Sequence, residues 1–281
     1  MSDRLAVLPQ YLMPKQALTV LAGKFANARL GGLTTAVIRR FVARYGVDMQ
    51  EAVNPDMASY ASFNEFFTRP LRGDARPLAD ADFICPVDGA ISQFGTITHG
   101  DIFQAKGHSY SAAALVGGDA ELAAQFADGS FATLYLSPRD YHRIHMPCAG
   151  RLRRMIHVPG ALFSVNPATV RGVPGLFARN ERVVCVFDGE QGPFVLTLVG
   201  ATIVGSMATV WHGVVNPPRS RTVHEWRYDD KEITLNKGEE MGRFLLGSTV
   251  VMLFPQNTLR FNPEWSPARA IRIGEAMCNK P

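Results

Sequence analysis

The segment Leu246-Gly247-Ser248-Thr249-Val250-Val251-Met252-Leu253-Phe254 decides both the fold and the chemistry expected of this chain. Its second half, Thr249–Phe254, is a short unbroken apolar run and predicts a strand of the core. Its first half places Ser248 directly behind a glycine, which has no side chain to block attack on its carbonyl and which tolerates the backbone angles of a strained peptide bond. The Gly247–Ser248 pair is therefore either a turn into the strand or a bond that the chain breaks by itself.

Self-cleavage of the Gly247–Ser248 peptide bond would change the chemistry of Ser248. The serine would become a pyruvoyl group, which is a carbonyl cofactor made from the chain. Gly-Ser pairs are common, so on the dipeptide alone the turn is the better interpretation. The rest of the sequence has to decide between the two.

Upstream of this strand, from about Ile84, the sequence is rich in β-branched and aromatic residues, which favour strands. Turns are expected at Asp188-Gly189 and Asp229-Asp230. The predicted strands are Phe131–Leu136, Arg151–Val158, Val183–Phe187, Phe194–Val210, Thr222–Tyr228 and Glu232–Leu235.

The first quarter of the chain has a helical pattern instead. Pro14 is suited to the first turn of a helix, and Gly31-Gly32 ends it. A second helix is expected from about Leu33 to Tyr45, and Ser62-Phe63-Asn64-Glu65 is a capping box that opens a third. The expected fold is α+β, with N-terminal amphipathic helices (residues 1–70) packed beside a largely antiparallel β catalytic body (residues 71–281).

Composition limits the classes of protein to consider. The chain has 281 residues and is 47% hydrophobic, enough for a full core. Its four cysteines show no metal-binding or disulfide spacing, and we expect them to be reduced. The N-terminus lacks the pattern of a signal peptide, and no apolar stretch approaches the roughly 18 residues of a membrane span. We therefore expect a protein that is made in the cytoplasm and stays there.

The net charge of +4 is concentrated at the N-terminus. Residues 1–46 contain seven Lys or Arg and one Asp, which gives 7 − 1 = +6, so the remainder sums to 4 − 6 = −2. Basic amphipathic helices usually pack on a protein core, but they can also dock at an anionic membrane surface. Binding to nucleic acid is not expected, because no recognised motif accompanies the charge.

Two further segments carry candidate catalytic residues. Asp88, before Gly89, is either a turn aspartate or a carboxylate that orients a histidine. His142 and His145 are either structural or basic, since a neutral imidazole can accept a hydroxyl proton near neutral pH. No further Cys, His or acidic cluster completes a metal site, so none is expected. Asp88, His145 and Ser248 together contain the parts of a base-activated nucleophile.

Five segments then form a series. They are Phe63-Asn64-Glu65-Phe66-Phe67-Thr68-Arg69, Pro86-Val87-Asp88-Gly89, Tyr141-His142-Arg143-Ile144-His145-Met146-Pro147, Phe163-Ser164-Val165-Asn166-Pro167, and Gly242-Arg243-Phe244 with Leu246-Gly247-Ser248-Thr249. In this order, across nearly the whole chain, the series resembles the motifs of the bacterial phosphatidylserine decarboxylase proenzymes. Five matches are far more specific than any one of them.

The resemblance implies a two-stage mechanism. In the first stage Asp88 orients His145, His145 deprotonates Ser248, and the chain splits into a β chain, 1–247, and an α chain, 248–281, that begins with the pyruvoyl group. In the second stage this group forms a Schiff base with phosphatidylserine, which loses carbon dioxide and leaves as phosphatidylethanolamine, a step of phospholipid biosynthesis. His142 is the candidate proton donor or carboxylate-positioning group of this stage.

The implied substrate also changes the interpretation of the N-terminal helices. A lipid head group lies at a membrane surface, so docking of residues 1–70 on an anionic phospholipid membrane, peripherally at the cytoplasmic face, becomes the expectation. The resemblance further implies a homodimer of cleaved α and β chains. The alternatives are a pyruvoyl-dependent decarboxylase of a soluble amino acid, a non-enzymatic membrane-binding protein, and a hydrolase that uses the same three residues.

Overall fold

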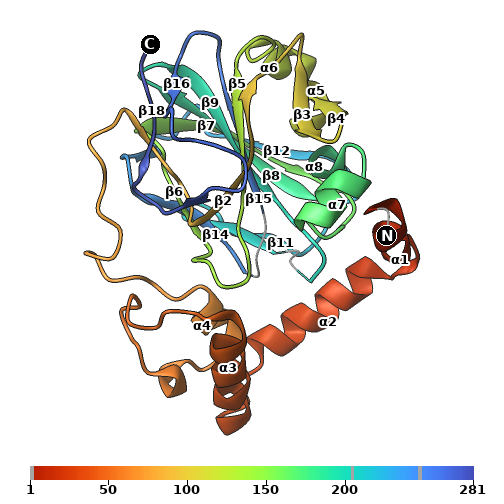
Figure 1. Ribbon diagram of the computed structural model, residues 1–281, viewed down its shortest axis with the longest axis vertical. Helices are drawn as coiled ribbons and strands as arrows, with labels where there is room; N and C mark the ends of the chain where they lie inside the picture. The colour runs from red at the N-terminus through yellow and green to blue at the C-terminus, as the bar shows by residue number, and fades with distance from the viewer. Residues whose placement is uncertain (1–2, 204–205, 246–248) are drawn as a thin grey trace.

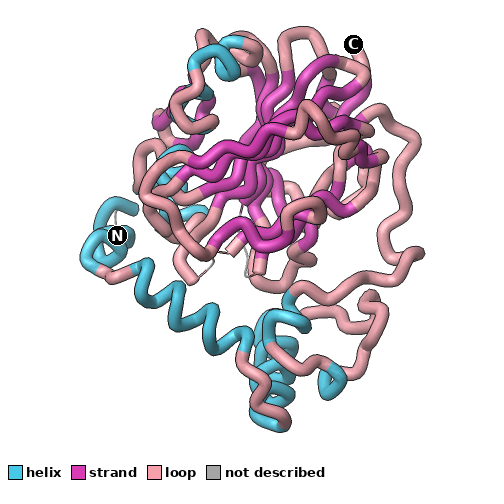
Figure 2. The backbone as a smooth tube through the Cα atoms, turned by 180° about the vertical axis from the view of Figure 1, so that it is seen from behind, coloured by secondary structure: helices cyan, strands magenta, loops and turns pink. Residues whose placement is uncertain are grey.

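The computed structural model describes residues 3–203, 206–245 and 249–281, and it is a mixed α+β structure, as expected. Figure 1 shows a β body with the N-terminal helices along its side and below it, and the view from behind in Figure 2 shows the same arrangement. A long segment without regular structure, residues 68–82, connects the helical part to the first strand of the body.

The helices of the described residues fall into an N-terminal group and four short helices on the body (Figure 1). The N-terminal group is α1 (Asp3–Leu12), α2 (Lys15–Asn27), α3 (Gly32–Tyr45), the 3-10 turn η1 (Met57–Ser59) and α4 (Phe63–Phe67). The short helices are α5 (Ala112–Leu115), α6 (Ala120–Ala124), α7 (Pro167–Gly172) and α8 (Leu176–Arg179).

The strands pair antiparallel throughout the sheets of the described chain. They are β1 (Phe83–Ile84), β2 (Gly89–Thr96), β3 (Asp101–Ala105), β4 (His108–Ser111), β5 (Ser130–Tyr135), β6 (Arg143–His145), β7 (Gly150–Val158), β8 (Arg182–Gly189), β9 (Gly192–Val199), β10 (Met207–Thr209), β11 (Gly213–Asn216), β12 (His224–Arg227), β13 (Thr234–Leu235), β14 (Glu240–Phe244), β15 (Thr249–Phe254), β16 (Arg260–Phe261), β17 (Ala270–Ile271) and β18 (Ala276–Asn279).

The strand β15 occupies the middle of the largest sheet, between β9 and β5, in the order β12-β7-β8-β9-β15-β5-β2-β17. All six of its residues are buried. Val250, Met252 and Phe254 pack in the core on one face of this sheet, whereas Val251 and Leu253 pack in the core on the other. The unbroken apolar run is explained by this burial on both faces, because alternate side chains of a strand point to opposite sides.

The predicted N-terminal helices are confirmed. Pro14 precedes α2, and Gly46 ends α3 with a left-handed backbone (φ 68°) that suits glycine. Ser62 accepts a hydrogen bond from the backbone N–H of Glu65 at the start of α4, as the capping box predicts. These helices enclose a small core of their own, made of Ile38, Val47, Met49, Ala52, Tyr60, Phe66 and Phe67.

The turn expected at Asp188-Gly189 lies two residues later, and two larger features also differ from the sequence-based expectation. The predicted strand Phe194–Val210 is interrupted, because β9 ends at Val199 and β10, in a different sheet, begins at Met207. The apolar pattern continues across the interruption, so periodicity alone does not reveal it. The helix α1 was not expected, and Gln10 fixes it to the body: its amide accepts from the Ser164 N–H at 2.9 Å and donates to the Thr169 hydroxyl at 3.0 Å.

Candidate active site

The two histidines of the site lie at β6, the last strand of a small sheet with the order β11-β10-β14-β6. The backbone N–H of His145 donates to the Pro86 carbonyl at 2.8 Å, which joins the histidine segment to the segment that carries Asp88. The N–H of Phe244, at the end of β14, donates to the carbonyl of His142 at 3.0 Å. Backbone pairing therefore brings together three of the sequence motifs that are far apart along the chain.

His145 is held as a neutral imidazole with one nitrogen available. Its Nδ1 lies 2.7 Å from the carbonyl oxygen of Gly238, and because a carbonyl can only accept, Nδ1 carries the proton. Its Nε2 is buried and has no hydrogen-bond partner among the residues described. Burial lowers the pKa of His145, and the backbone bond to Gly238 only partly offsets this. The arrangement leaves a lone pair on Nε2, which is what a general base needs.

His142 has the same arrangement in a deeper position. Its side chain is fully buried, Nδ1 donates to the Asp140 carbonyl at 2.6 Å, and Nε2 has no partner in the described part of the chain. The ring of Phe67, from α4, lies 4.1 Å away, centroid to centroid. Burial lowers the pKa of His142 to about 3. Two buried, unpartnered nitrogens within four residues are unusual in a folded protein and mark a functional site.

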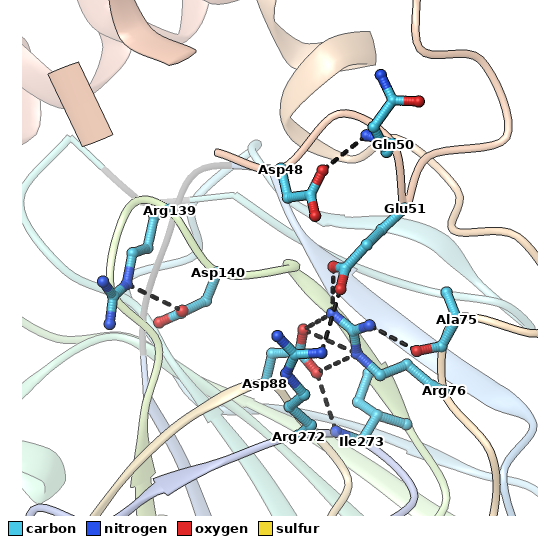
Figure 3. A network of polar contacts seen from close by, with 10 residues as sticks. All are labelled: Asp48, Gln50, Glu51, Ala75, Arg76, Asp88, Arg139, Asp140, Arg272 and Ile273. Atoms are coloured by element: carbon cyan, nitrogen blue, oxygen red, sulfur yellow. Dashed lines mark hydrogen bonds and ion pairs between the residues drawn. The ribbon is translucent and has the colours of Figure 1, made fainter. Parts of the chain in front are cut away.

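Asp88 lies just before β2, and its hydrogen bonds go to Arg76 and Ile273 (Figure 3). Arg76 donates from Nε at 3.0 and 3.1 Å and from Nη2 at 2.6 Å, and the N–H of Ile273 donates at 2.9 Å. No hydrogen bond joins Asp88 to His145 among the described contacts, so the orienting bond of this imidazole comes from Gly238. The negative charge of Glu240 and, less strongly, that of Asp88 also offset the lowering of the His145 pKa by burial.

The remaining predicted residues, Gly247 and Ser248, lie outside the described residues. The described neighbours on each side are Leu245, whose N–H donates to the Ser206 carbonyl at 3.0 Å, and Thr249, the first residue of β15. Thr249 is in register with Tyr135 of β5, which is also in register with Ala90 of β2. The strand that follows Ser248 thus starts two strands away from the residues next to Asp88.

A cavity of about 330 Å³ opens between the helical part and the body. Its lining includes Phe67, which contacts His142, and Tyr135, the register partner of Thr249. Most of the other lining side chains are apolar or aromatic, with Ser164, Asn166 and Thr202 as polar exceptions. A cavity with an apolar lining and a few polar groups suits an organic substrate that carries a polar end.

The site also contains residues that the sequence-based reasoning missed. Arg76, Glu51 and Gly238 were not singled out, because Arg76 meets Asp88 and Glu51 meets Arg76 only through tertiary folding, and Gly238 acts through its backbone. The one available signal was the arginine itself, since an arginine close in sequence to a candidate catalytic carboxylate is a possible partner for it. No group of three or more Cys, His, Asp or Glu side chains that could hold a metal ion occurs in the described ranges.

Comparison with known proteins gives consistent matches. The family model described as phosphatidylserine decarboxylase matches residues 63–279, and a second model, described as PSD, matches residues 5–46. A phosphatidylserine decarboxylase proenzyme of Dechloromonas aromatica (strain RCB) is 78% identical over 99% of this chain and 98% of its own length. Proenzymes of the same name from Azoarcus sp. (strain BH72) and Albidiferax ferrireducens are 76% and 74% identical, over 99% and 100% of this chain and 96% and 99% of their own lengths.

Proposed function

The chain belongs to the phosphatidylserine decarboxylase family, and we propose that it cuts itself between Gly247 and Ser248 before acting on phosphatidylserine at a membrane surface. As a member of this family it is a carboxy-lyase of phospholipid biosynthesis. The observation that carries the proposal is the buried, unpartnered Nε2 of His145, on an imidazole whose other nitrogen is fixed by Gly238.

In the maturation step, His145 accepts the hydroxyl proton of Ser248 at Nε2. The serine oxygen attacks the Gly247 carbonyl carbon, so that the peptide bond becomes an ester. A base then removes the α-proton of Ser248 and the Gly247 carboxylate leaves by β-elimination. Water hydrolyses the resulting dehydroalanine to the pyruvoyl group with release of ammonia. Asp88 favours the protonated imidazole that forms during this step, because its negative charge raises the histidine pKa against the effect of burial. The products are chains 1–247 and 248–281, and they stay together because β15 is buried on both faces of the sheet.

The described residues fit the pyruvoyl group that this step would leave at position 248. The segment that contains it connects β14, bonded to His142, with β15 beside Tyr135. Tyr135 lines the apolar cavity, and His142 packs against Phe67, another of its lining residues. The group supplies a carbonyl that accepts electrons when the substrate loses carbon dioxide. His142 is the candidate proton donor or carboxylate-positioning group of this stage. Its Nε2 has no partner among the described residues and carries a lone pair, so it has to take up a proton before it can donate one to the substrate or bind the substrate carboxylate.

A second hollow favours a lipid over a soluble amino acid. It has a volume of about 930 Å³, lies between α2 and α3, and has Arg39, Arg40 and Arg44 among apolar lining residues. It shares the lining residues Phe41, Tyr45, Phe63 and Ile203 with the cavity that Phe67 lines, so the two hollows adjoin. An apolar hollow with arginines in its lining suits an acyl chain attached to an anionic head group, whereas free serine has no apolar part to fill it.

The N-terminal helices supply the contact with the membrane in this proposal. They expose many large apolar side chains, namely Leu8, Tyr11, Leu12, Met13, Val20, Leu21, Phe25, Leu30, Leu33 and Tyr45. No helix in the described ranges has the length and hydropathy to cross a bilayer. Exposed apolar residues together with a charge of +6 over residues 1–46 suit peripheral docking on anionic lipid, at the cytoplasmic face. A homodimer of cleaved chains completes the proposal.

The test is a decarboxylation assay on purified protein with phosphatidylserine vesicles and, separately, with free serine. Release of carbon dioxide and phosphatidylethanolamine from the vesicles, with free serine untouched, supports the proposal. Equal turnover of free serine would favour the soluble amino acid decarboxylase. Vesicle binding without turnover would favour the non-enzymatic membrane protein.

A further inference from the structure

Arg76 is placed between two carboxylates that belong to different parts of the chain (Figure 3). On one side it donates three hydrogen bonds to Asp88, and on the other its Nη2 donates to Glu51 at 2.7 Å. Its Nη1 donates to the Ala75 carbonyl at 2.7 Å. The guanidinium group therefore uses all three of its nitrogens and is fixed in one orientation.

This contact is buried, unlike most ion pairs among the residues that the structure describes. The side chains of Arg76 and Asp88 are only 10% and 8% exposed. A forked guanidinium–carboxylate contact of this kind fixes the direction of the carboxylate as well as balancing its charge. Loss of one member leaves the other as an uncompensated buried charge, which is strongly unfavourable.

The three residues of this network come from three separate segments, and none of them lies within a helix or strand. Glu51 follows α3 in the helical part, Arg76 lies in the irregular segment between α4 and β1, and Asp88 precedes β2. The last bond of the carboxylate, from the N–H of Ile273, comes from the segment that follows β17. The backbone bond between His145 and Pro86 brings the segment of Asp88 to β6, and the contacts centred on Arg76 fix the direction of the Asp88 carboxylate within it.

We propose that Arg76 is a positioning residue for self-cleavage, which fixes the carboxylate of Asp88 in one orientation next to the segment that pairs with His145. The inference rests on the proposed function, because it concerns the same maturation step. Asp88 makes no described hydrogen bond to His145 and acts through its charge, so the effect of that charge depends on where the carboxylate lies. Arg76 sets this place, and Glu51 holds the far side of the guanidinium.

The experiment follows self-cleavage of newly made full-length chain in a cell-free synthesis, on a denaturing gel. Arg76→Ala is expected to slow cleavage roughly tenfold or more, because the buried carboxylate loses its compensating cation. Added guanidinium ion should restore part of the rate, since it can enter the space left by the side chain. Arg72→Ala is the matched control: Arg72 also pairs with a carboxylate, Asp74, in the same segment, but the pair is exposed, and cleavage should stay at the wild-type rate.

A double variant separates positioning from a purely structural role. In an Asp88→Asn background, Arg76→Ala should add little further slowing, because the carboxylate that it positions is already gone. If Arg76→Ala does not fold, Arg76→Lys decides, since it keeps the charge and loses the forked geometry, and slower cleavage is expected. Cleavage of a folded Arg76 variant at or above the wild-type rate would overturn the inference, as would full additivity with Asp88→Asn.

The wild-type chain and the Asp88→Asn variant test the proposed function separately from the Arg76 inference. If the wild-type chain does not cleave, or Asp88→Asn cleaves normally, the proposed maturation step fails. If the wild-type chain cleaves, Asp88→Asn is slow and the Arg76 variants are unaffected, the positioning inference alone fails.

Discussion

The Nδ1 atom of His145 donates to the carbonyl oxygen of Gly238 at 2.7 Å, and this bond fixes which nitrogen of the imidazole is free. A carbonyl oxygen has no proton to give, so Nε2 keeps its lone pair. His142 repeats the relationship with the carbonyl of Asp140 at 2.6 Å. Backbone carbonyls thus hold the proton of each histidine on Nδ1 and leave Nε2 as the basic nitrogen.

These paired bonds allow the two histidines to be tested with the same substitution. Asparagine can keep the donor to the backbone carbonyl but has no basic nitrogen in place of Nε2. His145→Asn should leave the chain uncut, because loss of a general base slows a proton transfer by roughly 10²- to 10⁴-fold. His142→Asn should cut normally and decarboxylate slowly. Gel analysis and the phosphatidylserine assay check this, and the reverse pattern would exchange the two assignments.

The carboxylate of Asp88 has a separate test. Asp88→Asn removes the negative charge that opposes the lowering of the His145 pKa by burial, so self-cleavage should slow while the fold is kept. The measurement is the half-time for disappearance of the full-length chain. An unchanged half-time would remove Asp88 from the maturation step.

The pH dependence of stability should carry the signature of His142. Burial holds its folded-state pKa at about 3, whereas the unfolded chain takes up the proton at the ordinary value of 6.5. Unfolding therefore binds a proton between these values, and the free energy of unfolding falls as the pH drops through that window, by up to about 1.4 kcal/mol per pH unit. The stabilisation that comes from the neutral state of His142 is complete only above pH 6.5, the pKa of this histidine in the unfolded chain.

Denaturant unfolding of a single uncut chain measures this effect. In a Ser248→Ala background, which should stay uncut, His142→Asn is expected to make the loss of stability between about pH 6 and about pH 4 shallower by close to one proton. Parallel curves for the two proteins would contradict the buried neutral state of His142.

Membrane docking can be tested on the two most exposed leucines of the N-terminal helices. Leu12 is 87% and Leu21 66% exposed, so substituting both with Glu should not disturb the core. Binding to anionic liposomes should weaken roughly tenfold or more, because each leucine contributes on the order of 1.5–3 kcal/mol when fully buried in an apolar phase. Self-cleavage should be unchanged.

The matched control for docking is Val214→Glu, an exposed apolar residue of β11 on the body. Its liposome binding should equal that of the wild-type protein. Equal weakening by Val214→Glu, or unchanged sedimentation of the double leucine variant, would argue against the N-terminal helices as the docking surface.

Local sequence signals predicted the elements that depend on local chemistry. The helices α2 and α3, the capping box of α4 and the strand β15 follow from proline and glycine positions, capping residues and an apolar run. The break between Val199 and Met207 was missed because β-branched and apolar residues continue through it. The helix α1 was missed because Gln10 docks it on residues more than 150 positions away.

Some residues of the candidate site could likewise be predicted from the sequence, and others could not. Asp88, His142 and His145 were found because their residue types carry chemistry and their segments resemble a known family. Glu51 and Arg76 were not found, because 25 and 12 residues separate them from Arg76 and Asp88, their respective partners, and only the folded chain brings these groups together. Gly238 has no side chain to attract attention, and its contribution is a carbonyl whose direction is set by the chain around it.

The most direct test of the central claim is an intact-mass spectrum of the purified protein under denaturing conditions. The account predicts two chains, 1–247 and 248–281, with the smaller lighter by one ammonia than a peptide that begins with serine. Ser248→Ala should give one full-length mass and no decarboxylation. A single uncut mass for the folded wild-type protein, or a smaller chain that still begins with serine, would contradict the formation of the pyruvoyl group from Ser248.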